Sequence, residues 1–226
     1  MNLPSFNTLS NPFKALIIVP TFVFSLFLST LLTSCSSPIS YDIRFDNVAY
    51  DAENRKTVVS AIDPSVENKI KELTDAITEL GPDVDRNEAQ FVAREAVLFP
   101  KVLANTYRLV FPPNTQNVLV NSGQRERGLC YHWAKDMTDH IVVGRTFNTL
   151  TLQRAVANQG RNFEHNVLTV AAKGKGIKDA YILDAWRHSS SLYWVKTSED
   201  PDYDWKKYFP RTYKVNPIET VSRKAY

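Results

Sequence analysis

An N-terminal apolar run limits which part of this sequence can form a folded domain. Residues 15–32 read ALIIVPTFVFSLFLSTLL, and Lys14 is the one charged residue among positions 1–34. A basic residue followed by an apolar stretch is typical of a secretory leader, and a run of this length is also sufficient for a membrane helix. We therefore predict a signal peptide over residues 1–34, with an uncleaved membrane anchor as the alternative.

The residues that end this run predict a lipid anchor. The stretch Leu32-Thr33-Ser34-Cys35 resembles the bacterial lipobox, whose cysteine is lipidated and becomes the first residue of the mature protein. The resemblance implies that lipid on Cys35 holds the protein on a membrane of the cell envelope, with a buried or free cysteine in an uncleaved helix as the alternative. Because Ser36 rather than Asp follows Cys35, it also implies the periplasmic face of the outer membrane in a Gram-negative cell.

The charge and the cysteine content exclude some classes of partner and of fold for the remaining chain. The full sequence has 27 Lys and Arg residues against 24 Asp and Glu residues, so we expect no nucleic acid partner. With Cys35 assigned to the lipid, Cys130 has no partner for a disulfide, which excludes a disulfide framework. The length fits one domain, which we place at residues 61–226 after a lipidated tether over residues 35–60.

The apolar periodicity predicts helices first and strands second. Residues 63–82 form an amphipathic helix pattern, a second helix is expected within residues 85–113 with a kink or break at Pro100, and a third begins near Gly128. Four later segments are typical of strands: residues 147–160, 163–172, 180–186 and 191–197. This order predicts an α+β fold with a mostly antiparallel sheet.

Cys130 is the candidate nucleophile. It lies two residues after Gly128, in the first turn of the predicted helix, where unpaired backbone N–H groups and the positive end of the helix dipole stabilise a thiolate. The alternative is a buried cysteine that packs as a small apolar side chain.

His165 and Asp184 are the candidate base and the group that orients it. They lie on two predicted strands, and if the hairpin is centred between Gly174 and Lys175, the two residues face each other directly. The register is an assumption, because a slip of one residue turns one side chain to the other face of the sheet. The sequence therefore predicts a triad of Cys130, His165 and Asp184.

Gln124, six residues before Cys130, is the candidate oxyanion residue. Its side-chain amide, together with the backbone N–H of Cys130, is predicted to donate to the oxyanion that forms when a thiolate attacks a carbonyl. The alternative is a solvated glutamine on a polar loop.

Metal ligands are not grouped in this sequence, and we expect no metal or other cofactor. Cys130 and His132 point apart on a helix, which makes them a poor zinc pair. The acidic run at residues 199–204 lacks the glycine and the closing glutamate of a calcium loop, which predicts a solvated acidic turn.

These motifs together resemble a known superfamily. The stretch GLCYHWA at residues 128–134 resembles the nucleophile motif of transglutaminase-like cysteine enzymes, and EHNVLTV and ILDAW resemble their His and Asp strands in the same order. The glutamine before the cysteine is similar to the oxyanion glutamine of papain relatives, which share this core. The resemblance covers about residues 120–195 and departs from the family at Val167 and Ala185, where Trp and Pro are frequent.

The resemblance implies a papain-like, transglutaminase-like core, in which the nucleophile helix packs on the antiparallel sheet after N-terminal helices. It implies acyl chemistry: Cys130 attacks a carboxamide or peptide carbonyl to form a thioester, His165 moves the proton, and Asp184 holds its tautomer. Water as acceptor gives a peptidase or amidase, and an amine gives an acyltransferase. A peptide, protein or peptidoglycan-type substrate suits the cell envelope. The alternatives are an inactive binding or assembly module of an envelope complex, with the helices before residue 110 as partner surface, and a purely structural lipoprotein.

Overall fold

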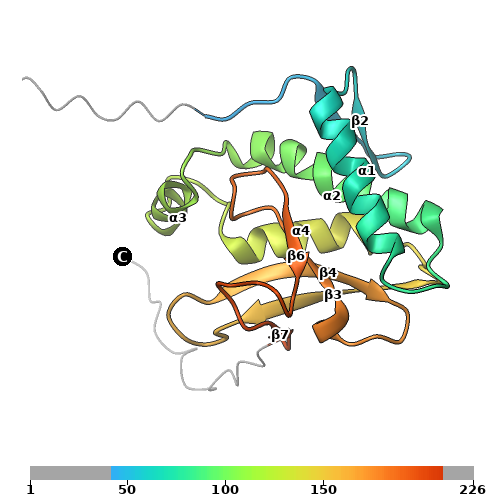
Figure 1. Cartoon of the computed structure of the whole chain (residues 1–226). Helices are drawn as coiled ribbons and strands as arrows, with labels where there is room; N and C mark the ends of the chain where they lie inside the picture. Colours follow the sequence, from blue (N-terminus) through green and yellow to red (C-terminus); the bar gives the residue numbers. More distant parts are fainter. Residues whose placement is uncertain (1–41, 211–226) are drawn as a thin grey trace, which may run out of the picture. The chain divides into compact units, whose positions relative to one another are not determined.

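Helices and antiparallel strands make up residues 42–210, the part of the chain that the computed structural model describes (Figure 1). The helices are α1 (Pro64–Thr78), α2 (Arg86–Tyr107), α3 (Pro113–Asn121) and α4 (Cys130–Ile141). The strands are β1 (Val48–Asp51), β2 (Lys56–Val59), β3 (Leu150–Ala157), β4 (His165–Ala172), β5 (Tyr181–Asp184), β6 (Tyr193–Lys196) and β7 (Lys206–Lys207). All strand pairs in this part of the chain are antiparallel, which confirms the predicted α+β class.

The predicted signal peptide and the lipid site at Cys35 lie outside the described residues. Within residues 42–210, no helix combines the length and the apolar character that crossing a membrane requires.

Aspartate caps determine where the first two helices begin. Asp63 accepts a hydrogen bond from the backbone N of Ser65 at 2.8 Å, and Asp85 accepts one from the backbone N of Asn87 at 2.6 Å. Such caps stabilise a helix by about 1 kcal/mol each. Helix α2 continues through Pro100, so of the kink or break predicted there, the break is wrong. The residues around Pro100 are buried on consecutive turns, and their packing outweighs the roughly 3 kcal/mol that a proline costs inside a helix.

The main core lies between the helices and the five-stranded sheet. Helix α4 packs on α2 and on β4, and α1 packs on α2 (Figure 1). Trp133, Met137 and Ile141 of α4 are buried at intervals of four residues, so they lie on one face of the helix. Because this face is fixed against the core, the direction in which the first turn of α4 presents Cys130 is fixed as well.

The five-stranded sheet has the order β6-β5-β4-β3-β7, and β4 at its centre is buried along its whole length. In the β4–β5 ladder Leu168 pairs with Leu183 and Thr169 with Ile182. The predicted register, in which His165 directly faces Asp184, is therefore wrong by two residues, because the connection contains a 3-10 turn at Ile177–Asp179. A slip of two residues keeps both side chains on the same face, where they are diagonal neighbours.

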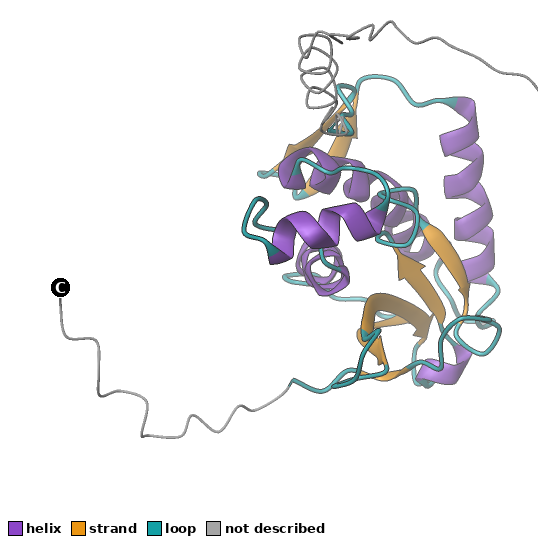
Figure 2. Ribbon diagram, turned by 90° about the vertical axis from the view of Figure 1, so that its left-hand side faces the viewer, coloured by secondary structure: helices purple, strands orange, loops and turns teal. Residues whose placement is uncertain are grey.

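A small β1–β2 hairpin lies on the other side of the helices from this sheet (Figure 2). These residues belong to the segment that the sequence analysis assigns to the tether, and they are attached to the folded part through a buried carboxylate. Glu95 of α2 accepts hydrogen bonds from the backbone N and the hydroxyl of Thr57, and its carboxylate lies 2.7 Å from His140 Nε2. Burial raises the pKa of Glu95, but the His140 and Thr57 hydrogen bonds outweigh it and lower this pKa overall.

Candidate active site

Cys130 lies in the first turn of α4, as predicted, and is its first residue. Leu129, at the N-cap position, has no side-chain oxygen to cap the helix. His132, in the first turn, reaches back to the residues before the helix: its Nδ1 accepts hydrogen bonds from the backbone N of Gly128 and of Leu129, both at 3.2 Å. Trp133 Nε1 donates to the carbonyl of Gly128 at 3.0 Å. An accepting Nδ1 requires a neutral imidazole ring, and burial followed by the charge of Arg127 lowers the pKa of His132 accordingly. The thiol is thus carried on a turn that is fixed from two sides.

Gly128 is required by this turn for two reasons. Its φ of +130° lies where side-chain-bearing residues are strained, and a Cβ at this position would lie 2.5 Å from Gln116 Cγ. Gln116 is buried and holds the surrounding loops together, since its amide accepts from Val110 N and donates to the carbonyls of Tyr107 and Arg127. The loop before Cys130 is therefore built around one buried glutamine.

His165 and Asp184 form a buried hydrogen-bonded pair. His165 begins β4, Asp184 ends β5, and His165 Nε2 lies 2.7 Å from Asp184 Oδ2. Their side chains are 2% and 1% exposed, so water screens this contact very little. Asp184 also accepts from the backbone N of Trp186 and of Arg187 and from Arg187 Nε. Burial raises the pKa of Asp184, but the hydrogen bond and the charge of His165, with the Arg187 contacts, lower it overall, so the carboxylate is ionised.

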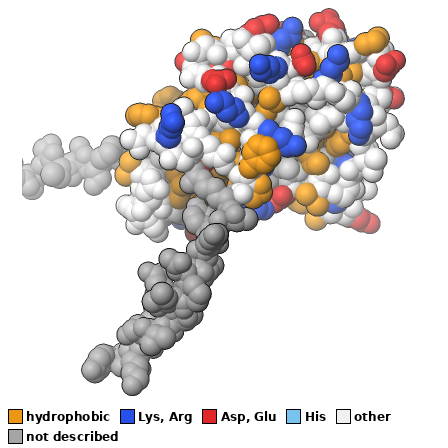
Figure 3. All heavy atoms as spheres, turned by 90° about the horizontal axis from the view of Figure 1, so that it is seen from below, with side chains coloured by type: hydrophobic (Ala, Val, Ile, Leu, Met, Phe, Trp, Pro, Cys, Tyr) orange, Lys and Arg blue, Asp and Glu red, His pale blue; other side chains and the backbone are white. Residues whose placement is uncertain are grey.

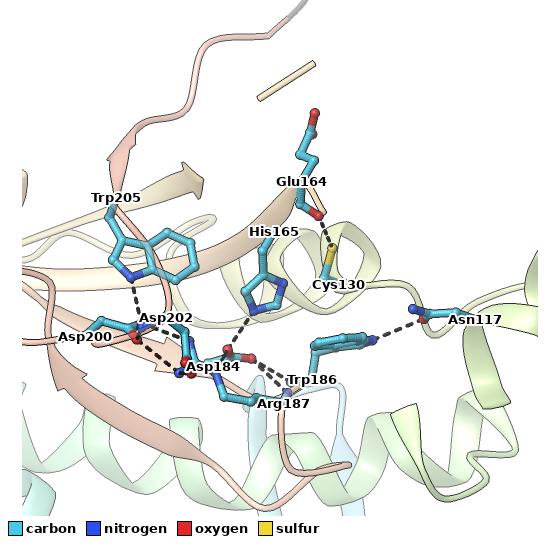
Figure 4. Close-up of polar contacts among 10 residues, drawn as sticks. All are labelled: Asn117, Cys130, Glu164, His165, Asp184, Trp186, Arg187, Asp200, Asp202 and Trp205. Atoms are coloured by element: carbon cyan, nitrogen blue, oxygen red, sulfur yellow. Dashed lines mark hydrogen bonds and ion pairs between the residues drawn. The ribbon is translucent and has the colours of Figure 1, made fainter. Parts of the chain in front are cut away.

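The imidazole of His165 lies between Asp184 and Cys130 (Figure 4). Burial lowers the pKa of His165, but the hydrogen bonds with Asp184 and with Cys130 and their charges raise it to about 9. At neutral pH the ring is therefore an imidazolium. Cys130 is partly exposed, and its Sγ lies 3.6 Å from the carbonyl oxygen of Glu164, the residue before His165. The structure thus brings the three predicted triad residues together in the order thiol, imidazole, carboxylate.

Three aromatic rings enclose the imidazole. The centroids of Trp186, Tyr203 and Trp205 lie 5.0, 4.8 and 5.5 Å from that of His165. Their packing keeps the His165–Asp184 contact out of water, which strengthens electrostatic interactions in the site. None of these rings was assigned to the site from the sequence, although Trp186 follows Asp184 by only two residues.

Arg187 connects the carboxylate of Asp184 to the loop between β6 and β7. Its guanidinium contacts Asp184 Oδ2 at 3.1 Å and Asp200 Oδ2 at 2.8 Å. Trp205 Nε1 donates to the same Asp200 oxygen at 2.8 Å. The expectation of a solvated turn at residues 199–204 is therefore wrong for Asp200, whose side chain is fully buried, while Asp202 is 61% exposed. The sequence could not indicate this, because a buried partner for Asp200 becomes visible only in three dimensions.

Gln124 is not brought to Cys130. Its side chain is exposed and donates to Ser122 Oγ at 3.0 Å, and it borders a different cavity with Arg108 and Arg125. Nearer to the triad lies Asn117 of α3, whose Oδ1 accepts from Trp186 Nε1 at 3.2 Å (Figure 4). This hydrogen bond fixes the orientation of the Asn117 amide and leaves its NH₂ group as the donor beside the site. Asn117 is a residue that sequence reasoning missed, since its place beside Trp186 depends on a contact between segments 69 residues apart in the chain.

Within residues 42–210, no group of three His, Cys, Asp or Glu side chains is arranged to hold a metal ion. Comparisons with models of protein families, with curated proteins and with solved structures found no match to this chain. What can be concluded about function therefore rests on the geometry of the residues described above.

Proposed function

We propose that this protein is a cysteine-dependent enzyme that cleaves or transfers an amide or peptide bond through a thioester. The main observation in support of this proposal is that the imidazole of His165 contacts both Cys130 and Asp184, and that it is hydrogen-bonded to the buried, ionised carboxylate of Asp184. A nucleophile, a base and a group that orients the base are the parts that acyl transfer requires.

The proposed reaction uses Cys130 as the nucleophile and protonated His165 as the acid. The thiolate of Cys130 attacks the substrate carbonyl carbon, and the carbonyl oxygen becomes an oxyanion near the start of α4. The imidazolium of His165 then gives its proton to the leaving amine, the carbon–nitrogen bond breaks, and a thioester with Cys130 remains. A water molecule attacks this thioester while neutral His165 takes its proton, which releases a carboxylic acid and restores the thiolate and imidazolium. An amine in place of water gives a new amide by the same steps.

The oxyanion is assigned to the backbone N–H of Cys130 and the side-chain amide of Asn117. The first N–H groups of a helix have no partner within the helix, and the amide of Asn117 is held by Trp186. Preorganised donors of this kind are typical of oxyanion sites. Gln124, the residue expected for this function, faces Ser122 instead.

A papain-like, transglutaminase-like core is part of the proposal. In support of it, a helix with Cys130 at its N-terminus packs on an antiparallel sheet that carries first His165 and then Asp184. The departures at Val167 and Ala185 leave the exact family open within this superfamily.

The cellular setting is proposed from the sequence alone. The apolar leader and the lipobox-like stretch before Cys35 support a lipid-anchored protein of the cell envelope, with a peptide, a protein or a peptidoglycan-type molecule as substrate. Incorporation of labelled palmitate into the full chain, and its loss in Cys35→Ser, tests the anchor. An unlabelled full chain contradicts it.

The test of the enzymatic proposal is the rate at which iodoacetamide alkylates Cys130, followed by mass spectrometry from about pH 4 to 9. We expect rapid alkylation below the range in which free thiols react, where half ionise at about pH 8.5, and a slower reaction in His165→Ala. His188→Ala is the matched control, because His188 is exposed and contacts Tyr193 rather than Cys130.

Slow alkylation that rises as for a free thiol and ignores His165 would contradict the proposal. The chain would then be better explained as a binding or assembly module that keeps the fold without the chemistry.

A further inference from the structure

A cavity of about 540 Å³ lies where α4 meets β3 and β4, and it is lined by chain neighbours of the triad rather than by the triad itself. Three of its lining residues are chain neighbours of the triad: Tyr131 follows Cys130, and Glu164 and Asn166 flank His165. Because Cys130 Sγ lies 3.6 Å from the Glu164 carbonyl, a substrate attached to this sulfur extends beside the cavity. The remaining polar lining comes from Lys135, Arg154 and Tyr208.

Two of the three charged residues in this lining already have polar partners. Lys135 forms an ion pair with Asp139 on the next turn of α4. The carboxylate of Glu164 accepts from the backbone N of Gly160 at 2.6 Å and from Asn166 Nδ2 at 3.2 Å.

Arg154 is different, since it forms no ion pair with any residue in the described part of the chain. Its Nη2 donates to the neutral amide oxygen of Asn166 at 3.2 Å, and its Nε is buried without a hydrogen-bond partner among residues 42–210. The guanidinium carbon lies 4.0 Å from the centroid of the Tyr208 ring, and the backbone N of Tyr208 donates to the Arg154 carbonyl at 3.1 Å. The cation is therefore held in place by a ring and an amide, and its buried Nε–H has no acceptor among residues 42–210.

A guanidinium of this kind matches a carboxylate. Its parallel N–H groups fit the two oxygens of a carboxylate, and a buried donor without a partner is a cost that a bound oxygen removes. Seen from the side that carries β7, Lys and Arg side chains lie among hydrophobic ones, with Asp and Glu side chains also present (Figure 3). Of the charged residues that line the cavity, Lys135 and Arg154 are basic and Glu164 is acidic.

We propose that this cavity binds a carboxylate of the substrate through Arg154, close to the carbonyl that Cys130 attacks. The substrate class is then an acidic peptide or amide. The carboxylate comes either from an acidic side chain or from the end of a chain. This inference rests on the proposed function, because it uses Cys130 as the site of attachment.

Alkylation reagents that differ only in charge test the proposal without a known substrate. The protein is the full chain with Cys35→Ser, in which Cys130 is the one thiol left. The reagents are N-iodoacetyl-glutamine amide, which is neutral, N-iodoacetyl-glutamate α-amide, which has the side-chain carboxylate, and N-iodoacetyl-glutamine, which has the chain-end carboxylate. We expect one of the two anionic reagents to react about tenfold faster than the neutral one, the size typical of a charge-assisted hydrogen bond.

The Arg154→Gln variant should lose this preference. Lys175→Gln should keep it, since it removes the same charge from an exposed turn at the other end of β4. If Arg154→Gln does not fold, the protein with Arg154 in place is used in a protection experiment instead. N-acetyl-glutamate should then slow the alkylation of Cys130 by iodoacetamide more than N-acetyl-glutamine amide does. The faster anionic reagent identifies the source of the carboxylate.

The possible results distinguish a failure of the carboxylate site from a failure of the enzymatic proposal. Equal rates for all three reagents, in a protein whose Cys130 still depends on His165 for its reactivity, overturn the carboxylate site and leave the enzymatic proposal intact. A preference that persists in Arg154→Gln overturns the assignment to Arg154. A Cys130 that reacts slowly with every reagent and ignores His165 overturns both proposals.

Discussion

The substitution Asp184→Asn tests the electrostatic basis of the site, because it removes a charge and keeps the shape. The single oxygen of asparagine can still accept from the backbone N of Trp186 and Arg187, which now bond to Oδ1, while its NH₂ group takes the place of Oδ2 beside His165 Nε2. What is lost is the acceptor at Oδ2 and the negative charge, which together with Cys130 raise the pKa of His165 from 6.5 to about 9. At 1.36 kcal/mol per unit, this shift corresponds to about 3 kcal/mol in favour of the imidazolium.

The expected result follows from this figure. With the charge removed, burial dominates and the pKa of His165 falls below 6.5, so that the ring is mostly neutral at pH 7. The thiolate of Cys130 then loses its counter-ion, and we expect alkylation by iodoacetamide at pH 7 to slow by about a hundredfold. NMR titration of the His165 ring proton measures the pKa shift directly.

Asp202→Asn is the matched control for this experiment. Asp202 also pairs with Arg187, at 3.2 Å, but it is 61% exposed and does not contact His165. We expect its effect on the alkylation rate to be less than about twofold, as is typical of exposed ion pairs. An Asp184→Asn protein in which His165 still titrates near 9, or equal effects of the two substitutions, would refute the electrostatic reasoning.

Three further predictions follow from the structure. Because the pKa of His165 is raised in the folded state, protonated His165 stabilises the fold fully below pH 6.5, and this stabilisation is lost as the pH rises through 9. The free energy of unfolding, measured with urea, should therefore fall by about 2–3 kcal/mol between these two pH values. The His165→Gln variant should not show this fall. Gly128→Ala should lower the free energy of unfolding by at least about 2 kcal/mol more than Gly123→Ala, because both positions have positive φ but only at Gly128 would the Cβ clash; equal losses would contradict the clash. Asn117→Ala should reduce kcat for amide hydrolysis by about a hundredfold, whereas Gln124→Ala should leave kcat unchanged; the reverse result would restore the oxyanion function expected for Gln124.

Local sequence patterns were sufficient for the class of the fold and for most of its elements. The α1 helix has an aspartate cap and a Gly-Pro stop, and the strands from β3 to β6 lie within the predicted segments. The position of Cys130 at the start of α4 also follows from a local feature, the glycine two residues before it. These are properties of short stretches of chain, so one sequence shows them.

The register and the surroundings of the site depend on contacts between distant segments. The hairpin loop could not reveal the turn at Ile177–Asp179, which moves the β4–β5 pairing by two residues. The contact between His165 and Asp184 exists nevertheless, because an even slip keeps both on one face and a diagonal pair of long side chains can meet. The choice between Gln124 and Asn117 likewise depends on how α3 folds back beside Trp186.

The charge balance of the buried cluster explains why His165 carries a proton at neutral pH. Two buried carboxylates, Asp184 and Asp200, face one guanidinium, that of Arg187. If His165 were neutral, one negative charge would remain without a counter-ion in an environment closed by three aromatic rings. Protonation of His165 places a second positive charge in this cluster. Arg187 lowers the pKa of Asp184, and the ionised Asp184, together with Cys130, raises the pKa of His165.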